Sequence, residues 1–114
     1  MLLDDRQERL DYLSNMYSGC EIYCARNYNE AINLLNNHKF ELVSLDHDLG
    51  DFYVPEMDEN LVERTGLDVA DYIRNMPADQ IPDEIIIHSS NPVGAKYMLL
   101  ALKEFNAKWR MVSV

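Results

Sequence analysis

Short apolar runs alternate along the chain with longer segments whose apolar residues recur every three or four positions. The apolar runs predict strands at residues 2–3, 21–25, 40–45, 84–88 and 109–114. The helical spacing predicts helices at residues 6–16, 29–37, 66–76 and 92–105. Strands that alternate with helices favour an α/β domain in which one parallel sheet carries helices on both faces.

Turn and capping residues set the expected boundaries. Asn29 is a plausible cap for the second helix, and Asn91 directly before Pro92 is the preferred start of a helix. The acidic segment 51–65, about fifteen residues, lacks clear periodicity. It is predicted to be a loop, of the length that usually forms a functional lid or is disordered. The helix that starts after Asn91 is expected to bury Val93, Tyr97, Met98, Ala101, Leu102 and Phe105.

Length and composition add limits. A chain of 114 residues is predicted to be one domain, and 47% hydrophobic with 26% charged residues is ordinary globular composition. The sequence shows no apolar run long enough to span a membrane and no secretory signal peptide. Cys20 and Cys24 are expected to be free thiols that pack rather than bind metal, in a reducing compartment. A cytoplasmic location is therefore expected.

The formal net charge of −10 argues against an extended nucleic-acid surface and against adhesion to anionic membranes. It is compatible with a small phosphorylated ligand, because a bound divalent cation or local donors can reverse the field inside a pocket. Most of the acidic residues can equally serve solubility alone.

Reactive polar groups follow three of the predicted strands. The motif Asp46-His47-Asp48 follows residues 40–45, the motif His88-Ser89-Ser90-Asn91 closes the fourth strand, and Asp4-Asp5 follow the first. Ligands of open parallel sheets bind at the carboxyl ends of the strands. The three motifs therefore predict one shared site.

The carboxylates of this site are Asp4, Asp5, Asp46 and Asp48. Like charges that converge call for a cation or a proton, and hard oxygen ligands suit Mg²⁺ or Mn²⁺. The alternative is that Asp4 and Asp5 form only the loop and cap of the first helix.

Two histidines are candidates for proton transfer. His47 and His88 lie at neighbouring strand ends, where one can activate a nucleophile at phosphorus while the other protonates a leaving oxygen. Either can instead be a structural side chain. His38 is expected to be a solvated loop residue.

The residues before Pro92 offer a place for an anion. Ser89, Ser90 and Asn91 are expected at a helix N-terminus, where backbone N–H groups and the helix dipole attract phosphate oxygens. Capping by Asn91 is compatible with this role. Gly94 allows close approach of backbone in the first turn.

Four runs together resemble a known family, the cyclic-phosphate processing receiver-like domain. They are residues 3–6, 44–50, 65–70 and 87–94. More distantly the chain resembles response-regulator receiver domains. The resemblance implies a flavodoxin-like sheet of strand order 2-1-3-4-5. It also implies an acidic pair (Asp4, Asp5) that binds Mg²⁺, an aspartate (Asp46) that accepts a phosphoryl group, and a hydroxyl (Ser89) that contacts it.

The chain departs from ordinary receivers in two respects. It lacks their lysine-proline pair at the end of the last strand, and it carries the two histidines. The leading hypothesis is therefore a phosphoesterase that processes a cyclic phosphate, either a nucleotide or a 2′,3′-cyclic RNA end, with Asp46, His47 and His88 as catalytic residues. One alternative is a non-catalytic module that binds a nucleotide or a protein. The other is a receiver phosphorylated on Asp46. The sequence does not indicate the oligomeric state.

Overall fold

The computed structural model describes residues 1–56 and 60–112, and residues 57–59 and 113–114 lie outside this description. Its strands are β1 (Leu2–Leu3), β2 (Cys24–Ala25), β3 (Leu42–Leu45), β4 (Asp51–Tyr53), β5 (Val62–Arg64), β6 (Glu84–Ile87) and β7 (Ala107–Trp109). Its helices are α1 (Gln7–Met16), α2 (Tyr28–Asn37), α3 (Gly66–Arg74) and α4 (Pro92–Ala101), with a 3₁₀ turn η1 (Ala78–Gln80).

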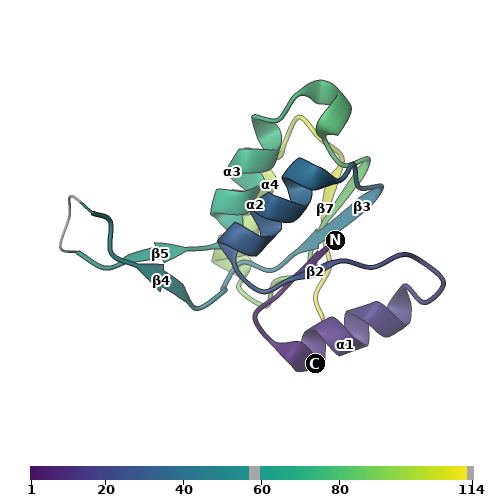
Figure 1. The fold of residues 1–114 in the computed structure, drawn as a ribbon, viewed down its shortest axis with the longest axis horizontal. Helices are drawn as coiled ribbons and strands as arrows, with labels where there is room; N and C mark the ends of the chain where they lie inside the picture. The colour runs from purple at the N-terminus through teal and green to yellow at the C-terminus, as the bar shows by residue number, and fades with distance from the viewer. Residues whose placement is uncertain (57–59, 113–114) are drawn as a thin grey trace.

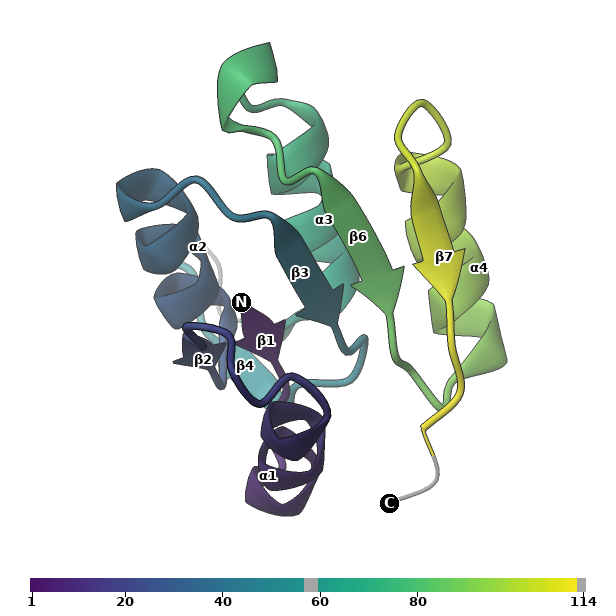
Figure 2. The same ribbon diagram turned by 90° about the vertical axis from the view of Figure 1, so that its right-hand side faces the viewer.

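Five strands form one parallel sheet in the order β2-β1-β3-β6-β7, which confirms the predicted α/β fold and its strand order. Helices lie on both faces, but unequally. Helices α2, α3 and α4 pack side by side on one face, whereas α1 lies on the other (Figures 1 and 2). This order puts the carboxyl ends of β1, β3 and β6 next to one another, at the same end of the sheet.

Alternation along the strands divides the sheet into two faces. Leu3, Val43, Leu45, Ile85 and Ile87 belong to the main core, under α2, α3 and α4. Leu2 packs with Leu10 and Leu13 of α1 on the opposite face. Ser44 and Ile86, which pair in register and alternate with the core residues, point to this second face. The face of the sheet to which a strand-end side chain points therefore follows from the alternation of side chains along its strand.

The prediction that residues 51–65 form a loop is wrong at residues 51–53 and 62–64, which form strands β4 and β5. Strands β4 and β5 pair antiparallel and form an arm that projects from the body (Figure 1). The Arg64 guanidinium lies over the rings of Tyr28 and Tyr53, at 4.2 and 4.8 Å from their centroids. The Asp51 carboxylate accepts the backbone N–H of Tyr28. These contacts, rather than apolar periodicity, hold the base of the arm, so the pattern in the sequence does not reveal it. Residues 57–59, which include Met57, lie outside the described residues.

Two further expectations are corrected. The last strand is residues 107–109 rather than 109–114, because Ala107 already pairs with Ile85 after the short turn that follows α4. Residues 113–114 of that expected strand lie outside the described part. Helix α2 is capped by Asn27, whose side chain accepts the N–H of Glu30, and not by Asn29.

Burial was also overestimated in places. Val93 and Tyr97 of α4 are 64% and 56% exposed, because α4 lies at the end of the helical layer. Cys20 and Cys24 are free thiols as expected, but both are exposed. His38 is partly buried against Tyr23 and Phe40. Among the helices that the structure describes, none has the length and apolar character that crossing a membrane would require.

Candidate functional site

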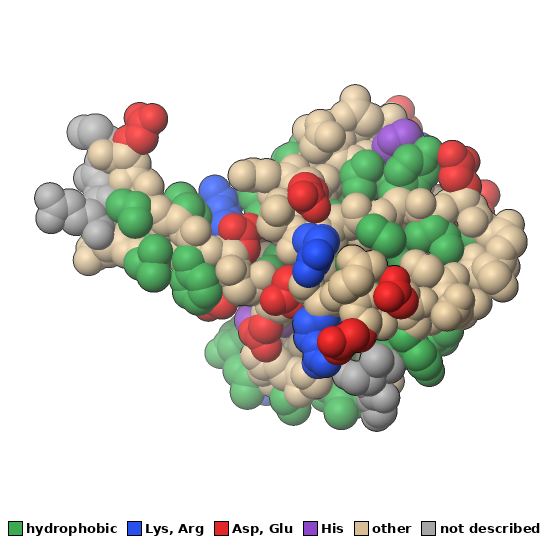
Figure 3. Space-filling view, turned by 60° about the horizontal axis from the view of Figure 1, so that its bottom comes forward, with side chains coloured by type: hydrophobic (Ala, Val, Ile, Leu, Met, Phe, Trp, Pro, Cys, Tyr) green, Lys and Arg blue, Asp and Glu red, His purple; other side chains and the backbone are tan. Residues whose placement is uncertain are grey.

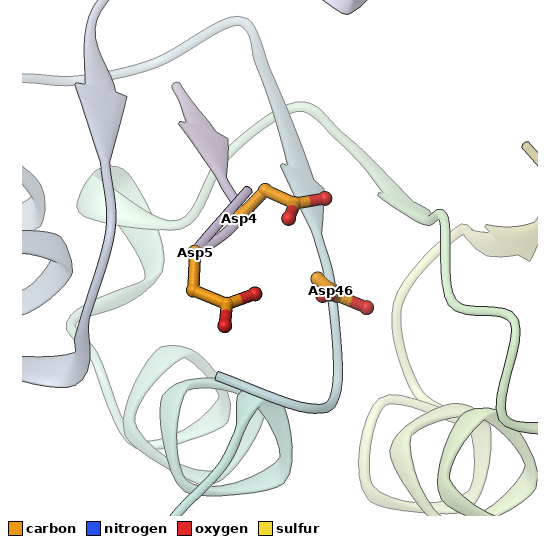
Figure 4. Close-up of side chains that lie close together, drawn as sticks. All are labelled: Asp4, Asp5 and Asp46. Atoms are coloured by element: carbon orange, nitrogen blue, oxygen red, sulfur yellow. The ribbon is translucent and has the colours of Figure 1, made fainter. Parts of the chain in front are cut away.

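Three carboxylates converge where β1 and β3 end. Asp4 and Asp5 follow β1, Asp46 follows β3, and one oxygen of each lies within 4.8 Å of the others. Figure 4 shows the three side chains directed into the space between the two strand ends. Asp4 and Asp46 are buried and Asp5 is partly exposed, so the cluster opens to solvent on the side of Asp5. The sequence predicts that four carboxylates converge here; Asp4, Asp5 and Asp46 do so, whereas Asp48 lies outside the cluster.

A buried arginine from α1 enters the cluster. The Nη1 atom of Arg9 lies 3.1 Å from Oδ2 of Asp4 and 3.3 Å from Oδ2 of Asp46. The Arg9 side chain is only 7% exposed, and its Nε atom has no hydrogen-bond partner among the described residues. One guanidinium thus faces three carboxylates, which leaves the site with an excess of negative charge.

His88 joins the cluster from the end of β6. Its Nε2 atom lies 3.0 Å from Oδ2 of Asp4, and its Nδ1 atom lies 2.6 Å from Oγ of Ser44. An ionised carboxylate only accepts hydrogen bonds, so Nε2 carries a proton that it donates to Asp4, while Nδ1 bonds to the Ser44 hydroxyl. All three side chains are at most 1% exposed. His88 therefore fixes the Asp4 carboxylate, with both ring nitrogens already engaged.

The surroundings shift the pKa values of the two buried carboxylates in opposite directions. Burial raises the pKa of Asp46 to about 7, with repulsion from Asp4 as the next cause, against partial relief from Arg9. Burial also acts to raise the pKa of Asp4, but hydrogen bonds from His88 and from the backbone N–H of Arg6 outweigh it and leave that pKa below its ordinary value. Asp4 is thus the stably ionised member, whereas Asp46 gains or loses its proton near neutral pH.

His47 and Asp48 form a separate pair beside the cluster. Nδ1 of His47 lies 2.8 Å from Oδ1 of Asp48, and the amide of Asn91 lies 3.4 Å from both oxygens of that carboxylate. The His47 ring packs against Gly94, where a Cβ atom would meet the ring at 2.5 Å. Asp48 is exposed and lies outside the three-carboxylate cluster. The expected close approach at Gly94 is present, and it brings the start of α4 to His47.

The first turn of α4 is capped as the sequence predicts. Asn91 accepts the N–H of Gly94 through its side chain, and the hydroxyl of Ser89 accepts the N–H of Asn91. Ser89 is fully buried, and its carbonyl accepts the indole N–H of Trp109. Ser90 is exposed and Asn91 partly so. The two accessible residues of the predicted phosphate-binding set are therefore Ser90 and Asn91.

Two glycines let backbone pass close to the carboxylates. Gly50 has φ +59°, a conformation that favours glycine, and a Cβ atom there would touch Oδ2 of Asp5. At Gly66 a Cβ atom would overlap the backbone carbonyl of Asp46, whereas the Gly66 N–H donates to the carbonyl of His47. Both glycines hold the segment after β3 in place around the site.

Sequence reasoning missed Arg9 and Ser44. Ser44 carried a signal, because a hydroxyl interrupts the apolar run Leu42-Val43-Ser44-Leu45 on a buried strand. Arg9 carried a weaker one, since it directly precedes Leu10 on the buried side of α1. A charged residue next to a helix's apolar stripe is usually exposed, which is why only the structure reveals its role.

The carboxylate cluster has the chemistry of a divalent cation site. Three carboxylates on two strand ends supply hard oxygen ligands, and their net negative charge exceeds what Arg9 neutralises. Across the described part of the chain, Figure 3 shows acidic and basic side chains interleaved on the face that contains the strand ends. The cluster Asp4-Asp5-Asp46 can therefore bind a metal ion.

Comparisons with known proteins agree with this geometry. A crystal structure of a response regulator protein from Burkholderia pseudomallei, which holds a phosphorylated aspartic acid, a calcium ion and citrate, matches with a TM-score of 0.67 and 20% sequence identity. The match covers 99% of this chain but only 59% of that chain, and at this identity it shows the fold alone. No curated protein matches the chain. The model of the cyclic-phosphate processing receiver domain matches residues 1–104. The chain therefore belongs to the family of cyclic-phosphate processing receiver domains.

Proposed function

We propose that the protein is a phosphoesterase that opens a cyclic phosphate, such as a 2′,3′-cyclic nucleotide or the cyclic end of an RNA. The observation that carries the proposal is the three-carboxylate cluster Asp4-Asp5-Asp46 at the strand ends of a domain from this family. The net charge of −10 supports a small ligand held by a local site rather than a long nucleic acid.

A divalent cation, Mg²⁺ or Mn²⁺, is the proposed cofactor. Asp5 and Asp46 would hold it together with Asp4, and it would supply positive charge for the non-bridging oxygens of the phosphate. Asp48 would act at a distance from the metal, because its carboxylate engages His47 and Asn91 instead.

The reaction needs one proton acceptor and one proton donor. Water forms a new oxygen–phosphorus bond and gives up a proton, one ring phosphorus–oxygen bond breaks, and the departing oxygen takes a proton. His47 is the proposed proton carrier, because Asp48 occupies its Nδ1 atom and leaves Nε2 for the ligand. His88, with both nitrogens bonded, would hold Asp4 in its ionised form.

Asp46 is the second proposed proton carrier. Its pKa of about 7 matches the operating pH, which is the condition for an efficient general acid or base. Because a carboxylate that binds a cation stays ionised, Asp46 would carry the proton only while Asp4 and Asp5 hold the cation. Ser90 and Asn91 would hold the non-bridging oxygens at the N-terminus of α4. Buried Ser89 would set the position of Asn91.

The projecting arm is the proposed contact for the nucleoside. Phe52, Val54 and Leu61 are 54%, 58% and 64% exposed on it, and Figure 3 shows hydrophobic side chains gathered there. The arm begins directly after Gly50, where an added Cβ atom would lie 3.4 Å from Oδ2 of Asp5, so a ligand bound at the carboxylates would lie at the base of the arm. Exposed aromatic rings can stack on a base.

Turnover of defined substrates tests the proposal. Purified protein is incubated with 2′,3′-cyclic nucleotides and Mg²⁺ or Mn²⁺, and the monophosphate product is followed by ³¹P NMR. His47→Gln is expected to lower kcat about 10²-fold or more, the usual contribution of a general acid or base. Asp83→Asn, which removes an exposed carboxylate far along the chain, is the matched control. Equal rates for wild type and His47→Gln would reject the mechanism, and no turnover would reject these substrates.

A second candidate function is phosphorylation of Asp46. The structural match to a response regulator that carries a phosphorylated aspartic acid favours it. NMR with beryllofluoride distinguishes the two candidates. Shifts that follow a single binding event and vanish in Asp46→Asn would support the receiver function, whereas cyclic-nucleotide turnover supports the esterase.

A further inference from the structure

Arg9 occupies the position that a metal ion on this site would need. Its Nη1 atom contacts Oδ2 of Asp4 and Oδ2 of Asp46, and both carboxylates belong to the proposed ligand set. The Arg9 guanidinium and a divalent ion cannot both lie between the same two oxygens. The guanidinium is therefore the site's present counter-ion.

The Arg9 side chain is incompletely satisfied where it lies. A guanidinium has five N–H donors, yet its Nε atom is buried without a partner in the described part of the chain. A buried donor without a partner disfavours the arrangement that creates it. The ion pairs with two carboxylates favour the buried position of Arg9, whereas the unpartnered Nε–H disfavours it. Such a balance is expected of a side chain that can move out of the site.

We propose that Arg9 is a displaceable internal counter-ion, which holds Asp4 and Asp46 together in the metal-free protein and is expelled when a divalent cation binds. This inference rests on the metal site of the proposed function and adds the residue that controls its affinity. Arg9 is a positioning residue in this scheme. It keeps the empty carboxylates from repelling one another, and it sets the metal concentration at which the site fills.

Arg26 provides a matched control. Its guanidinium also lies beside the cluster, but it donates to the backbone carbonyl of Asp5 and is exposed. Removing Arg26 takes one positive charge from the neighbourhood without freeing a carboxylate oxygen. A comparison of Arg9→Met with Arg26→Met therefore separates two effects. One is competition between Arg9 and the metal for the carboxylate oxygens, and the other is a general change in the electrostatic potential at the site.

Mn²⁺ binding measured by electron paramagnetic resonance tests the inference without any substrate. Arg9→Met is expected to bind Mn²⁺ at least tenfold more tightly than wild type, and Arg26→Met to stay within about twofold of it. The inference would be overturned if Arg9→Met bound Mn²⁺ with the same affinity as wild type. It would also be overturned if Arg9→Met and Arg26→Met gained the same Mn²⁺ affinity. An absence of Mn²⁺ binding by both wild type and Arg9→Met would overturn it as well.

A measurement on the wild type covers the case in which Arg9→Met does not fold. The Nε–H signal of Arg9 is followed by ¹⁵N NMR during a Mg²⁺ titration. It is expected to shift and to exchange faster with solvent as Asp5 and Asp46 amide signals report saturation. An unchanged Nε–H signal at saturation would show that Arg9 stays, and the inference would fail. Turnover of cyclic nucleotides is measured separately, so a failure here is distinguishable from failure of the proposed esterase.

Discussion

The Asp46→Asn substitution tests the electrostatics of the site directly. Burial, with repulsion from Asp4, raises the pKa of Asp46 from 3.8 to about 7 in the folded protein. The folded state then binds this proton more tightly than the unfolded state. The raised pKa of Asp46 therefore stabilises the folded protein fully below about pH 4, where Asp46 is protonated in both states. This stabilisation is lost as the pH rises to about 7.

The magnitude follows from the linkage between protons and folding. A difference of about three pKa units, at about 1.36 kcal/mol each, corresponds to about 4 kcal/mol. Asn cannot ionise, so the variant lacks this pH dependence. The free energy of unfolding of wild type minus that of Asp46→Asn should therefore fall by about 4 kcal/mol between pH 4 and pH 8. The attraction between ionised Asp46 and Arg9 is already contained in the pKa of about 7, so it is part of this pH dependence.

Urea unfolding in EDTA, followed by circular dichroism at half-unit steps of pH, measures this difference. The difference is needed because the Met1 amine, whose pKa burial lowers to about 6, acts in the opposite direction between pH 6 and pH 8. Asp83→Asn controls for the loss of a surface carboxylate. A flat difference curve for Asp46→Asn would refute the raised pKa, and with it the role of Asp46 as a proton carrier near neutral pH.

Three other substitutions have defined outcomes. Gly66→Ala should lower the free energy of unfolding by about 2 kcal/mol or more, because its Cβ overlaps the carbonyl of Asp46; a stability gain in urea unfolding would contradict this. Thr65→Ala removes the capping-box side chain of α3 and should cost about 1 kcal/mol in the same assay, so an unchanged midpoint would speak against the cap. Ser44→Ala leaves Nδ1 of His88 without its partner and should cost about 1–3 kcal/mol, and a neutral result would show that water replaces the hydroxyl.

The alternating pattern predicted the fold well because parallel strands buried on both faces carry strong apolar runs. Strands β3 and β6 and helices α1 to α4 lie close to where the sequence places them. The arm β4–β5 was not predictable in this way, since its strands bury little apolar surface and depend on Arg64 and Asp51 contacts. The last strand was misplaced because apolar residues continue beyond the point where β6 ends and pairing stops.

The site was partly predictable for a topological reason. Once β1 and β3 are neighbours, Asp4, Asp5 and Asp46 must follow adjacent strand ends, and the sequence is enough to bring them together. The pairing of side chains was not predictable. Asp48 follows Asp46 by two residues, yet the chain has turned after β3, and Asp48 meets His47 instead of the cluster.

The alternation of side chains along each strand explains why the remaining site residues converge. Leu2 and Asp4 share one face of the sheet, as do Ser44 and Asp46, and Ile86 and His88. On that face the row of Leu2, Ser44 and Ile86 is followed two residues later by the ionisable row of Asp4, Asp46 and His88. Because α1 alone among the described helices covers this side, its apolar residues meet the first row and Arg9 meets the second.

This geometry implies that the site's charge balance depends on how α1 sits on the sheet. Arg9 can reach Asp4 and Asp46 only while Leu10 and Leu13 keep α1 packed against Leu2. A change that loosens α1 would therefore withdraw the counter-ion as well as apolar contact, and the carboxylates would then require a proton or a metal ion. At the proposed metal site, affinity would therefore depend on the packing of α1, although none of the three carboxylates of the cluster lies on that helix.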